Sequence, residues 1–305
     1  DMVAVKDADC AKDMTKDGLD LKVDGDWLYA EGTSLGGADG IAVAYALALL
    51  DSDSIPHPRL EVIITVDEET GMEGANAIDL SSCRGRRMLN LDNEEEGVLL
   101  TSCAGGARVH GKLNVSCEKV SGTRMEISFE GLKGGHSGAE IDKDRANANA
   151  LLGRMMRFLP KEADARFLSL EGGSADNAIP SASRAVLVVK KEAVSAVREA
   201  LLKLEETLRR EYASTDSGLH IRIGGEENGE WEAFSRESTE KVTNILYLCP
   251  NGIQRMSADI PGLVQTSLNL GILQTENGCV GFDYYVRRSV GSEKHMIIDK
   301  VCLLL

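Results

Sequence analysis

Residues 60–71 read LEVIITVDEETG, an apolar and mostly β-branched run that ends in three consecutive carboxylates and a glycine. The run has the length and residue types of a buried parallel strand. Burying an unpaired carboxylate is costly, and ligands of open α/β sheets bind beyond the carboxyl ends of the strands. Asp67, Glu68 and Glu69 are therefore predicted either to face solvent or to hold a cation. The plainer alternative is an acidic loop that opens a helix and complements its dipole.

The same pattern recurs one step along the chain. Residues 86–91 are predicted to form a strand, and the acidic run DNEEE, residues 92–96, follows it. A helix over residues 74–80 would connect the two strands and bring both acidic clusters to one edge of a parallel sheet. Neither cluster contains Lys or Arg, so one or two divalent metal ions are the simplest counter-charge. Oxygen ligands alone would suit Mg²⁺, Ca²⁺ or Mn²⁺, and added His would suit Zn²⁺ or Co²⁺.

A glycine-rich loop, GTSLGGADG over residues 32–40, precedes this region and leads into an Ala/Leu segment predicted to be helical. Such loops often bind phosphate at a helix N-terminus, but the Lys-Ser/Thr pair of a P-loop is absent. Asp39 would repel phosphate and attract cations. This residue is therefore either a metal ligand or the N-cap of the helix.

Composition limits the possible partners and compartments. The 305 residues suggest two domains, and a net charge of -15 argues against nucleic acid or an anionic membrane as a partner. No run reaches the roughly 18 apolar residues of a membrane span. The 7 cysteines are dispersed without a Cys-x-x-Cys pair, which argues against a zinc ribbon and favours a reducing, cytoplasmic location.

The sequence pattern changes near residue 105. Residues 1–105 have the strand and helix pattern of an α/β domain, and residues 106–305 have that of an α+β domain with two helices on an antiparallel sheet. Within the second domain, residues 147–159 and 194–212 are predicted helices, and Glu226 to Glu232 is predicted to be an acidic loop.

Several motifs, in order along nearly the whole chain, resemble those of M20-type metallopeptidases and most of all the bacterial aminoacyl-histidine (Xaa-His) dipeptidases. The motifs include DMV (1–3), GTSLG (32–36), DEETGM (67–72), DNEEEG (92–97), GLKGGHSG (131–138), NAIP (177–180), PNG (250–252) and TSLNLG (266–271). The resemblance implies that residues 1–105 are the N-terminal half of a catalytic domain, mostly a parallel sheet with helices. Residues 106–305 would be an α+β lid and dimerisation domain with an antiparallel sheet, through which two copies pair.

The resemblance also implies a metal centre. Asp39 would bridge two metal ions, and Glu69 and Asp92 would each bind one of them. Glu68 would be the general base, and Asp1 would orient a metal-binding histidine. A gap-free alignment from Thr33 puts Ala38 at the bridging position, whereas a shift of one residue puts Asp39 there.

Three further residues fall at the family's substrate positions. His136 would polarise the scissile carbonyl, in related enzymes often across a dimer. Asn177 and Arg287 would contact the substrate, and Arg287 could bind its terminal carboxylate. The residue before Asn177 is basic in the family but is Asp176 here, a difference that could alter carboxylate recognition.

The implied activity is the hydrolysis of dipeptides, including Xaa-His, by a water held between two divalent ions. Zinc is expected, with cobalt or manganese as alternatives. The family's two metal-binding histidines would lie before Asp1 and beyond Leu305, so the chain is expected to be a fragment lacking both ends and to be inactive alone. The alternatives are an M20 amidohydrolase acting on N-acyl amino acids and a non-catalytic dimerisation scaffold.

Overall fold

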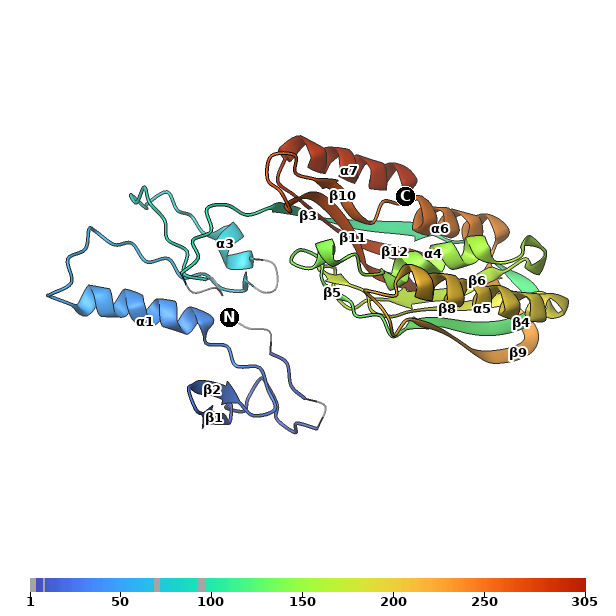
Figure 1. The fold of residues 1–305 in the computed structure, drawn as a ribbon, viewed down its shortest axis with the longest axis horizontal. Coiled ribbons are helices and arrows are strands. Elements are labelled where there is room, and N and C mark those ends of the chain that lie inside the picture. Colours follow the sequence, from blue (N-terminus) through green and yellow to red (C-terminus); the bar gives the residue numbers. More distant parts are fainter. Residues whose placement is uncertain (1–3, 8, 69–71, 93–96) are drawn as a thin grey trace. The chain divides into compact units, whose positions relative to one another are not determined.

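The computed structural model describes residues 4–7, 9–68, 72–92 and 97–305. The chain divides into two compact units, residues 1–100 and residues 101–305. Each unit is described here by itself (Figure 1). Within the described ranges, every helix is too short or too polar to cross a lipid bilayer.

In its described residues, the first unit contains a hairpin and two helices. Strands β1 (Leu21–Asp24) and β2 (Trp27–Ala30) pair antiparallel, and Gly25 between them has a φ of 59°. The left-handed conformation is open to glycine at little cost, which explains the tight turn. Helix α1 spans Ala38–Asp51, as the Ala/Leu pattern predicts, and α3 spans Glu73–Ala77.

The strands predicted over residues 60–66 and 86–91 are wrong: the structure has no strand in either range. Ile64 and Val66 are 66% and 67% exposed, and Met88 is 85% exposed. Parallel strands are stable when helices cover both faces of their sheet, and no helix buries these residues in the part of the chain described. The helix predicted over residues 74–80 is also shorter, because α3 ends at Ala77.

The second unit is built on an eight-stranded sheet with the order β3-β12-β11-β6-β8-β4-β9, in which β10 pairs with β11. Every described strand pair is antiparallel, as expected for residues 106–305. The strands are β3 (Gly105–Asn114), β4 (Cys117–Glu130), β6 (Arg166–Gly172), β8 (Ser183–Val189), β9 (His220–Phe234), β10 (Gly252–Met256), β11 (Val264–Glu276) and β12 (Cys279–Arg288).

Four helices accompany this sheet: α4 (Ala148–Phe158), α5 (Val194–Glu211), α6 (Arg236–Leu248) and α7 (Gly291–Leu304). The sequence analysis predicted the first two and missed α6. A set of elements β4-α4-β6-β8-α5-β9 forms a split β-α-β arrangement with the spatial order β6-β8-β4-β9. The mixed α/β class is confirmed, with a large antiparallel sheet as its main feature.

The remaining elements repeat most of this arrangement. In the sheet, β12 lies between β3 and β11, just as β8 lies between β4 and β6 in the first set. Along the chain, α6 comes after β9 and α7 comes after β12. The two sets join where Leu273 of β11 pairs with Gly172 of β6. Helices α4 and α6 pack together, and a Cβ at Gly153 of α4 would lie 2.5 Å from the Cβ of Leu246. The edge strand of the first set is therefore already paired within the chain.

The core of the second unit lies between the sheet and its helices, which lie along the sheet in Figure 1. Along β12, buried side chains alternate with half-buried ones, the period of a strand with two different faces. The largest fully buried side chains include Phe129, Phe167, Phe234, Phe282 and Tyr284.

The acidic loop predicted over Glu226 to Glu232 is wrong, because these residues belong to β9 and pair with β4. The carboxylates of Glu226, Glu227, Glu230 and Glu232 are exposed on this outermost strand. Charged side chains on an edge strand oppose pairing with other chains, so a polar composition is compatible with a strand here.

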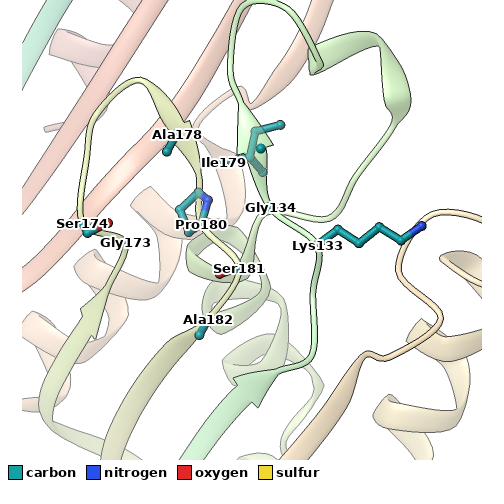
Figure 2. Close-up of a pocket in the computed structure, with 10 residues that line it drawn as sticks. Lys133, Gly134, Gly173, Ser174, Ala178, Ile179, Pro180, Ser181 and Ala182 are labelled. Atoms are coloured by element: carbon teal, nitrogen blue, oxygen red, sulfur yellow. The ribbon is translucent and has the colours of Figure 1, made fainter. Parts of the chain in front are cut away.

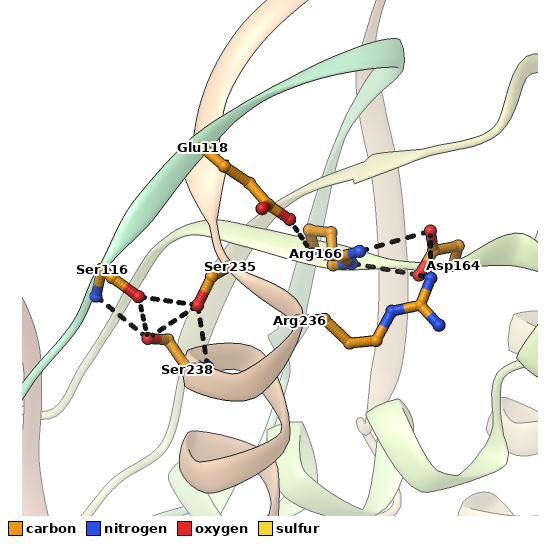
Figure 3. A network of polar contacts seen from close by, with 7 residues as sticks. All are labelled: Ser116, Glu118, Asp164, Arg166, Ser235, Arg236 and Ser238. Atoms are coloured by element: carbon orange, nitrogen blue, oxygen red, sulfur yellow. Dashed lines mark hydrogen bonds and ion pairs between the residues drawn. The ribbon is translucent and has the colours of Figure 1, made fainter.

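A polar network fixes the start of α6 (Figure 3). The hydroxyl of Ser235 caps the helix, and Arg236 in its first turn donates to Asp164 at 2.9 Å. Arg166, whose side chain is only 7% exposed, donates to Asp164 at 3.0 Å and to Glu118 at 2.7 Å. Burial of this guanidinium is tolerable because carboxylates from two directions neutralise it.

Candidate functional site

The predicted histidine lies in a glycine-rich loop between β4 and α4. His136 and Gly135 form the two-residue strand β5 (Gly135–His136), which pairs with β7 (Ala178–Ile179). Gly134 and Gly135 have φ values of 61° and 137°, a region that side chains with a Cβ rarely adopt. The glycines therefore let the chain turn sharply on the approach to His136.

The ring of His136 is oriented by its own loop. Its Nδ1 accepts hydrogen bonds from the backbone N–H groups of Gly138 at 3.3 Å and Ala139 at 3.0 Å. In the neutral ring the proton then resides on Nε2. Arg287 Nη2 lies 3.4 Å from this Nε2, but both atoms are donors in that tautomer, so the contact is not a hydrogen bond. The Nε2–H remains available to an acceptor.

Burial, followed by the charge of Arg287, lowers the pKa of His136 below its ordinary value, and Glu140 opposes the shift. Both causes disfavour a second positive charge at this position. His136 is therefore neutral near pH 7. A neutral imidazole that presents an N–H can donate to a carbonyl oxygen without exchanging a proton in the ground state.

Glu140 and Arg145, which belong to the same loop, stabilise it through hydrogen bonds to its backbone and to each other. Glu140 accepts from the backbone N–H of His136 at 3.0 Å, from Lys143 at 2.9 Å and from Arg145 at 2.9 Å. Arg145 also donates to the carbonyl oxygen of Gly134. The bond from Lys143, the bond from the His136 amide and the charge of Arg145 lower the pKa of Glu140 to about 2. Its carboxylate is therefore ionised at neutral pH, where it accepts all three hydrogen bonds.

Asp216 ties the two ends of the same loop together. Its fully buried carboxylate accepts from the backbone N–H groups of Lys133 at 2.8 Å and Ala146 at 2.9 Å. These residues flank the segment that carries His136. The sequence analysis did not identify Asp216, since nothing near residue 216 indicates that its partners lie some 70 to 83 positions earlier.

Arg287 lies on β12 beside His136. Its guanidinium carbon is 4.4 Å from the ring centroid of Tyr285, and a Cβ at Gly138 would approach it to 2.9 Å. Its Nε is buried and has no hydrogen-bond partner. Burial is the main cause that lowers the pKa of Arg287, while Tyr285 and Asp176 act in the opposite sense. The guanidinium of Arg287 is thus packed in place and has an N–H donor without an acceptor.

Asn177 is exposed and lies in the connection between β6 and β7. Its carbonyl oxygen accepts from the backbone N–H of Ser137 at 2.8 Å, which joins this connection to the His136 loop. Asn269 of β11 donates to the carbonyl oxygens of Asp176 at 3.1 Å and Ala178 at 2.7 Å. Arg287, His136 and the segment that carries Asn177 therefore lie close to one another.

The asparagines of two other motifs support this segment. Asn147, the N-cap of α4, donates to Asn251 at 3.2 Å and to Asn269 at 3.1 Å, and Asn251 accepts from the backbone N–H of Leu270 at 3.0 Å. The PNG and TSLNLG motifs contain two of these residues, but their sequence positions gave no role. The structure gives them one: they fix the backbone around Asn177.

A cavity of about 380 Å³ adjoins the His136 loop (Figure 2). Its lining consists mostly of glycine, alanine and serine from residues 133–135, 173–174 and 178–182. Lys133 is the only charged side chain in this lining. Residues of β5 and β7 contribute to the lining, but none of the three predicted substrate residues, His136, Asn177 and Arg287, does.

The predicted metal ligands lie in the first unit. Asp39 is in the first turn of α1, whose N-cap is Gly37, so the alternative role of Asp39 as the N-cap is wrong. Glu68 and Asp92 are both exposed. Glu69 and Asp1 lie outside the described residues.

A metal site needs several ligands in one place. Among the residues that the structure describes, no group of three or more His, Cys, Asp or Glu side chains could hold a metal ion. The described part of the first unit therefore does not itself form the predicted centre, of which Glu69 would be one member. The backbone N–H of Gly74, in α3, donates to the carbonyl oxygen of Val66 at 3.0 Å.

Comparison with known proteins gives this arrangement a context. Residues 127–216 match the M20 family described as the peptidase dimerisation domain. The chain is 34% identical to the cytosol non-specific dipeptidase of Escherichia coli over 301 residues, which are 98% of this chain and 62% of that protein. It is also 35% identical over 81 residues, 25% of this chain and 22% of that protein, to the uncharacterized protein YqjE of Bacillus subtilis.

Among solved structures, the aminoacylhistidine dipeptidase of Vibrio alginolyticus superposes with a TM-score of 0.80 at 32% identity. The match covers 100% of this chain and 63% of that one. The chain thus spans less than two thirds of the length of these two dipeptidases. The resemblance to M20-type dipeptidases that the motifs indicated is confirmed, as is the mixed α/β class.

Proposed function

We propose that the protein carrying this chain is an M20-type dipeptidase, which hydrolyses dipeptides with a free C-terminus, Xaa-His among them. One observation supports this most directly. A neutral His136, held by two backbone N–H groups, presents its Nε2–H beside the guanidinium of Arg287. The pair offers one donor for the carbonyl oxygen of the scissile peptide bond and one cation for the C-terminal carboxylate, and a dipeptide carries both of these groups.

The roles follow from the chemistry of each group. His136 donates from Nε2 to the scissile carbonyl oxygen, on which negative charge develops as the carbon is attacked. Arg287 binds the C-terminal carboxylate through its planar donors, and its stacking on Tyr285 limits the entropy lost on binding. Asn177, on the segment tied to Ser137, contacts the substrate beside them.

Dipeptidases of the M20 type are metal-dependent in general, and a bound metal would polarise the carbonyl and activate water. We propose two divalent ions, zinc or else cobalt or manganese, with Asp39, Glu69 and Asp92 as ligands. Glu68 would be the general base, and Asp1 would orient a further ligand. The described residues hold no group of three such ligands, so we derive no catalytic step through the metal.

The proposed partners are a dipeptide and a second copy of the chain, paired through the lid domain of residues 106–305. The match of residues 127–216 to a peptidase dimerisation domain supports the pairing. A cytoplasmic location is proposed as well, because the Escherichia coli relative is described as a cytosol enzyme.

The test is a set of assays on the natural full-length protein. We expect release of both amino acids from dipeptides, loss of activity with a chelator, and recovery with Zn²⁺, Co²⁺ or Mn²⁺. Glu68→Gln is expected to lower kcat by at least about 10²-fold, the size of a general-base contribution, with little effect on KM. Hydrolysis of N-acetyl amino acids in place of dipeptides would instead identify an amidohydrolase.

A second candidate function is a non-catalytic dimerisation scaffold, which the match to the dimerisation domain supports. The discriminating result is a dimer that neither hydrolyses dipeptides nor gains thermal stability from Zn²⁺ or Mn²⁺. A ligand that binds only the folded state raises the melting temperature, so the metal titration reports on the site without relying on turnover.

A further inference from the structure

Two arginines share one tyrosine ring on the exposed face of the sheet. Arg108 of β3 pairs in register with Tyr285 of β12, and Arg287 lies two residues further along β12. Their guanidinium carbons are 5.5 Å and 4.4 Å from the centroid of the Tyr285 ring. Side chains two residues apart on a strand point to the same face, so both cations belong to one patch.

The two arginines differ in their partners. Arg108 donates from Nε to the carboxylate of Asp176, whose side chain is 16% exposed. No ion pair joins Arg287 to a carboxylate of the described residues, and its Nε is buried without an acceptor. The patch therefore holds two guanidinium groups and one carboxylate, which leaves one net positive charge.

Asp176 is fixed in this position by its backbone. Its carbonyl oxygen accepts from Asn269 at 3.1 Å, and a Cβ at Gly271 would come within 2.5 Å of its Cα and 2.4 Å of its oxygen. The segment thus rests directly on β11, and only glycine at position 271 permits this approach. Asp176 precedes Asn177, so the carboxylate that neutralises Arg108 is part of the proposed substrate segment itself.

We infer that Asp176 is a specificity-determining residue, which occupies Arg108 and leaves Arg287 as the one guanidinium of the patch open to a ligand carboxylate. This inference rests on the proposed dipeptidase function. A patch with one unpaired cation suits a substrate whose C-terminal residue carries a single carboxylate. A second carboxylate, on the side chain of a C-terminal Asp or Glu, would be repelled by Asp176. It could not pair with Arg108, because Arg108 is already paired with Asp176.

Asp176→Asn tests the inference because it keeps the shape of the side chain and removes its charge. In the natural full-length protein, we compare kcat/KM for two dipeptides that differ only in ending in Asp or Asn. Freeing Arg108 is expected to raise the Asp-to-Asn ratio about tenfold, the size of one charge-assisted hydrogen bond. The double variant Arg108→Gln/Asp176→Asn is expected to return the ratio to the wild-type value.

The matched control is Asp283→Asn. Asp283 lies on β12, the strand of Arg287, and pairs with His110 at 2.9 Å. The variant therefore removes a carboxylate near the patch without releasing an arginine. Its ratio is expected to equal that of the wild type. An unchanged ratio in Asp176→Asn, or a raised ratio in the double variant, overturns the inference.

Calorimetric binding of the same two peptides gives the ratio independently of turnover. A wild-type protein that hydrolyses neither peptide refutes the proposed function, whereas the binding ratio still decides the role of Asp176. An about tenfold rise of the Asp-to-Asn binding ratio in Asp176→Asn over the wild type supports the inference in that case too, and an unchanged binding ratio refutes it.

Discussion

The two units of this chain differ in how they are held together. In the first unit, Ala30 is the only buried hydrophobic residue among those described, and large apolar side chains such as Trp27 and Leu99 are 78% and 90% exposed. The second unit buries a continuous core between its sheet and its helices. Each fully buried aliphatic or aromatic side chain contributes roughly 1.5–3 kcal/mol, so nearly all of this hydrophobic stabilisation lies in the second unit.

A sequence motif with a clear chemical pattern can therefore lack a stable fold around it. Residues 60–71 carry the clearest chemical pattern in the sequence, but the structure has no strand over residues 60–68, the part of this range that it describes. The loop of His136 has an equally clear pattern and is fixed by Asp216, Glu140 and β7. The two motifs differ in their long-range contacts: the His136 loop is bonded to distant segments of the chain, and residues 60–66 are largely exposed.

The strongest test of this comparison is backbone hydrogen exchange on the intact chain. We expect amides of β4 and β8 to exchange at least ~10³-fold more slowly than those of residues 60–66, because exchange from a core strand requires global unfolding. Mass spectrometry after timed labelling measures this directly. Equal protection in the two regions would show that the first unit is as stable as the second.

Truncating one side chain in each unit compares how much the two units contribute to the free energy of unfolding. Phe167→Ala, at a fully buried position, is expected to lower the free energy of unfolding by about 3–5 kcal/mol. Val62→Ala, at a position 47% exposed, is expected to change it by less than about 0.5 kcal/mol. Denaturant titration followed by circular dichroism gives both values. Similar losses at the two sites would contradict the picture.

The clamp on the His136 loop can be removed with Asp216→Ala. Loss of the acceptor for one buried and one part-buried backbone N–H group is expected to cost about 2–3 kcal/mol and to speed exchange at Lys133 and Ala146. Asp142→Ala is the control, since Asp142 is an exposed residue of the same loop. A cost no greater than that of the control would mean that other contacts hold the loop.

The smallest expected effect is on the titration of His136. Its pKa is lowered by burial and by Arg287, so the unfolded chain binds more protons in the window below the ordinary histidine pKa. Stability is therefore fully present above that ordinary pKa and falls as pH drops toward the lowered value. Arg287→Gln should raise the pKa of His136, measured by NMR titration of the ring protons. An unchanged pKa would show that burial alone causes the shift.

Much of the second unit could be predicted from local sequence signals. The helix beginning after Asn147 and the long helix α5 follow from apolar spacing. The hairpin at Gly25 in the first unit follows from turn chemistry. Strand β6 and helix α6 were missed, and Glu226 to Glu232 was misassigned, because an edge strand and a polar helix face give weak local patterns.

The sequence was enough to indicate the residue types of the candidate site, its glycine-rich loop and the resemblance to M20-type dipeptidases, since these depend on the order of residues along the chain. Tertiary structure alone decided that Asp216 anchors the loop of His136 and that Arg108 engages Asp176. Arg108 and Asp176 lie 68 positions apart, and only the register of the sheet brings them into contact. A contact between distant segments depends on how the whole sheet pairs, which no local pattern encodes.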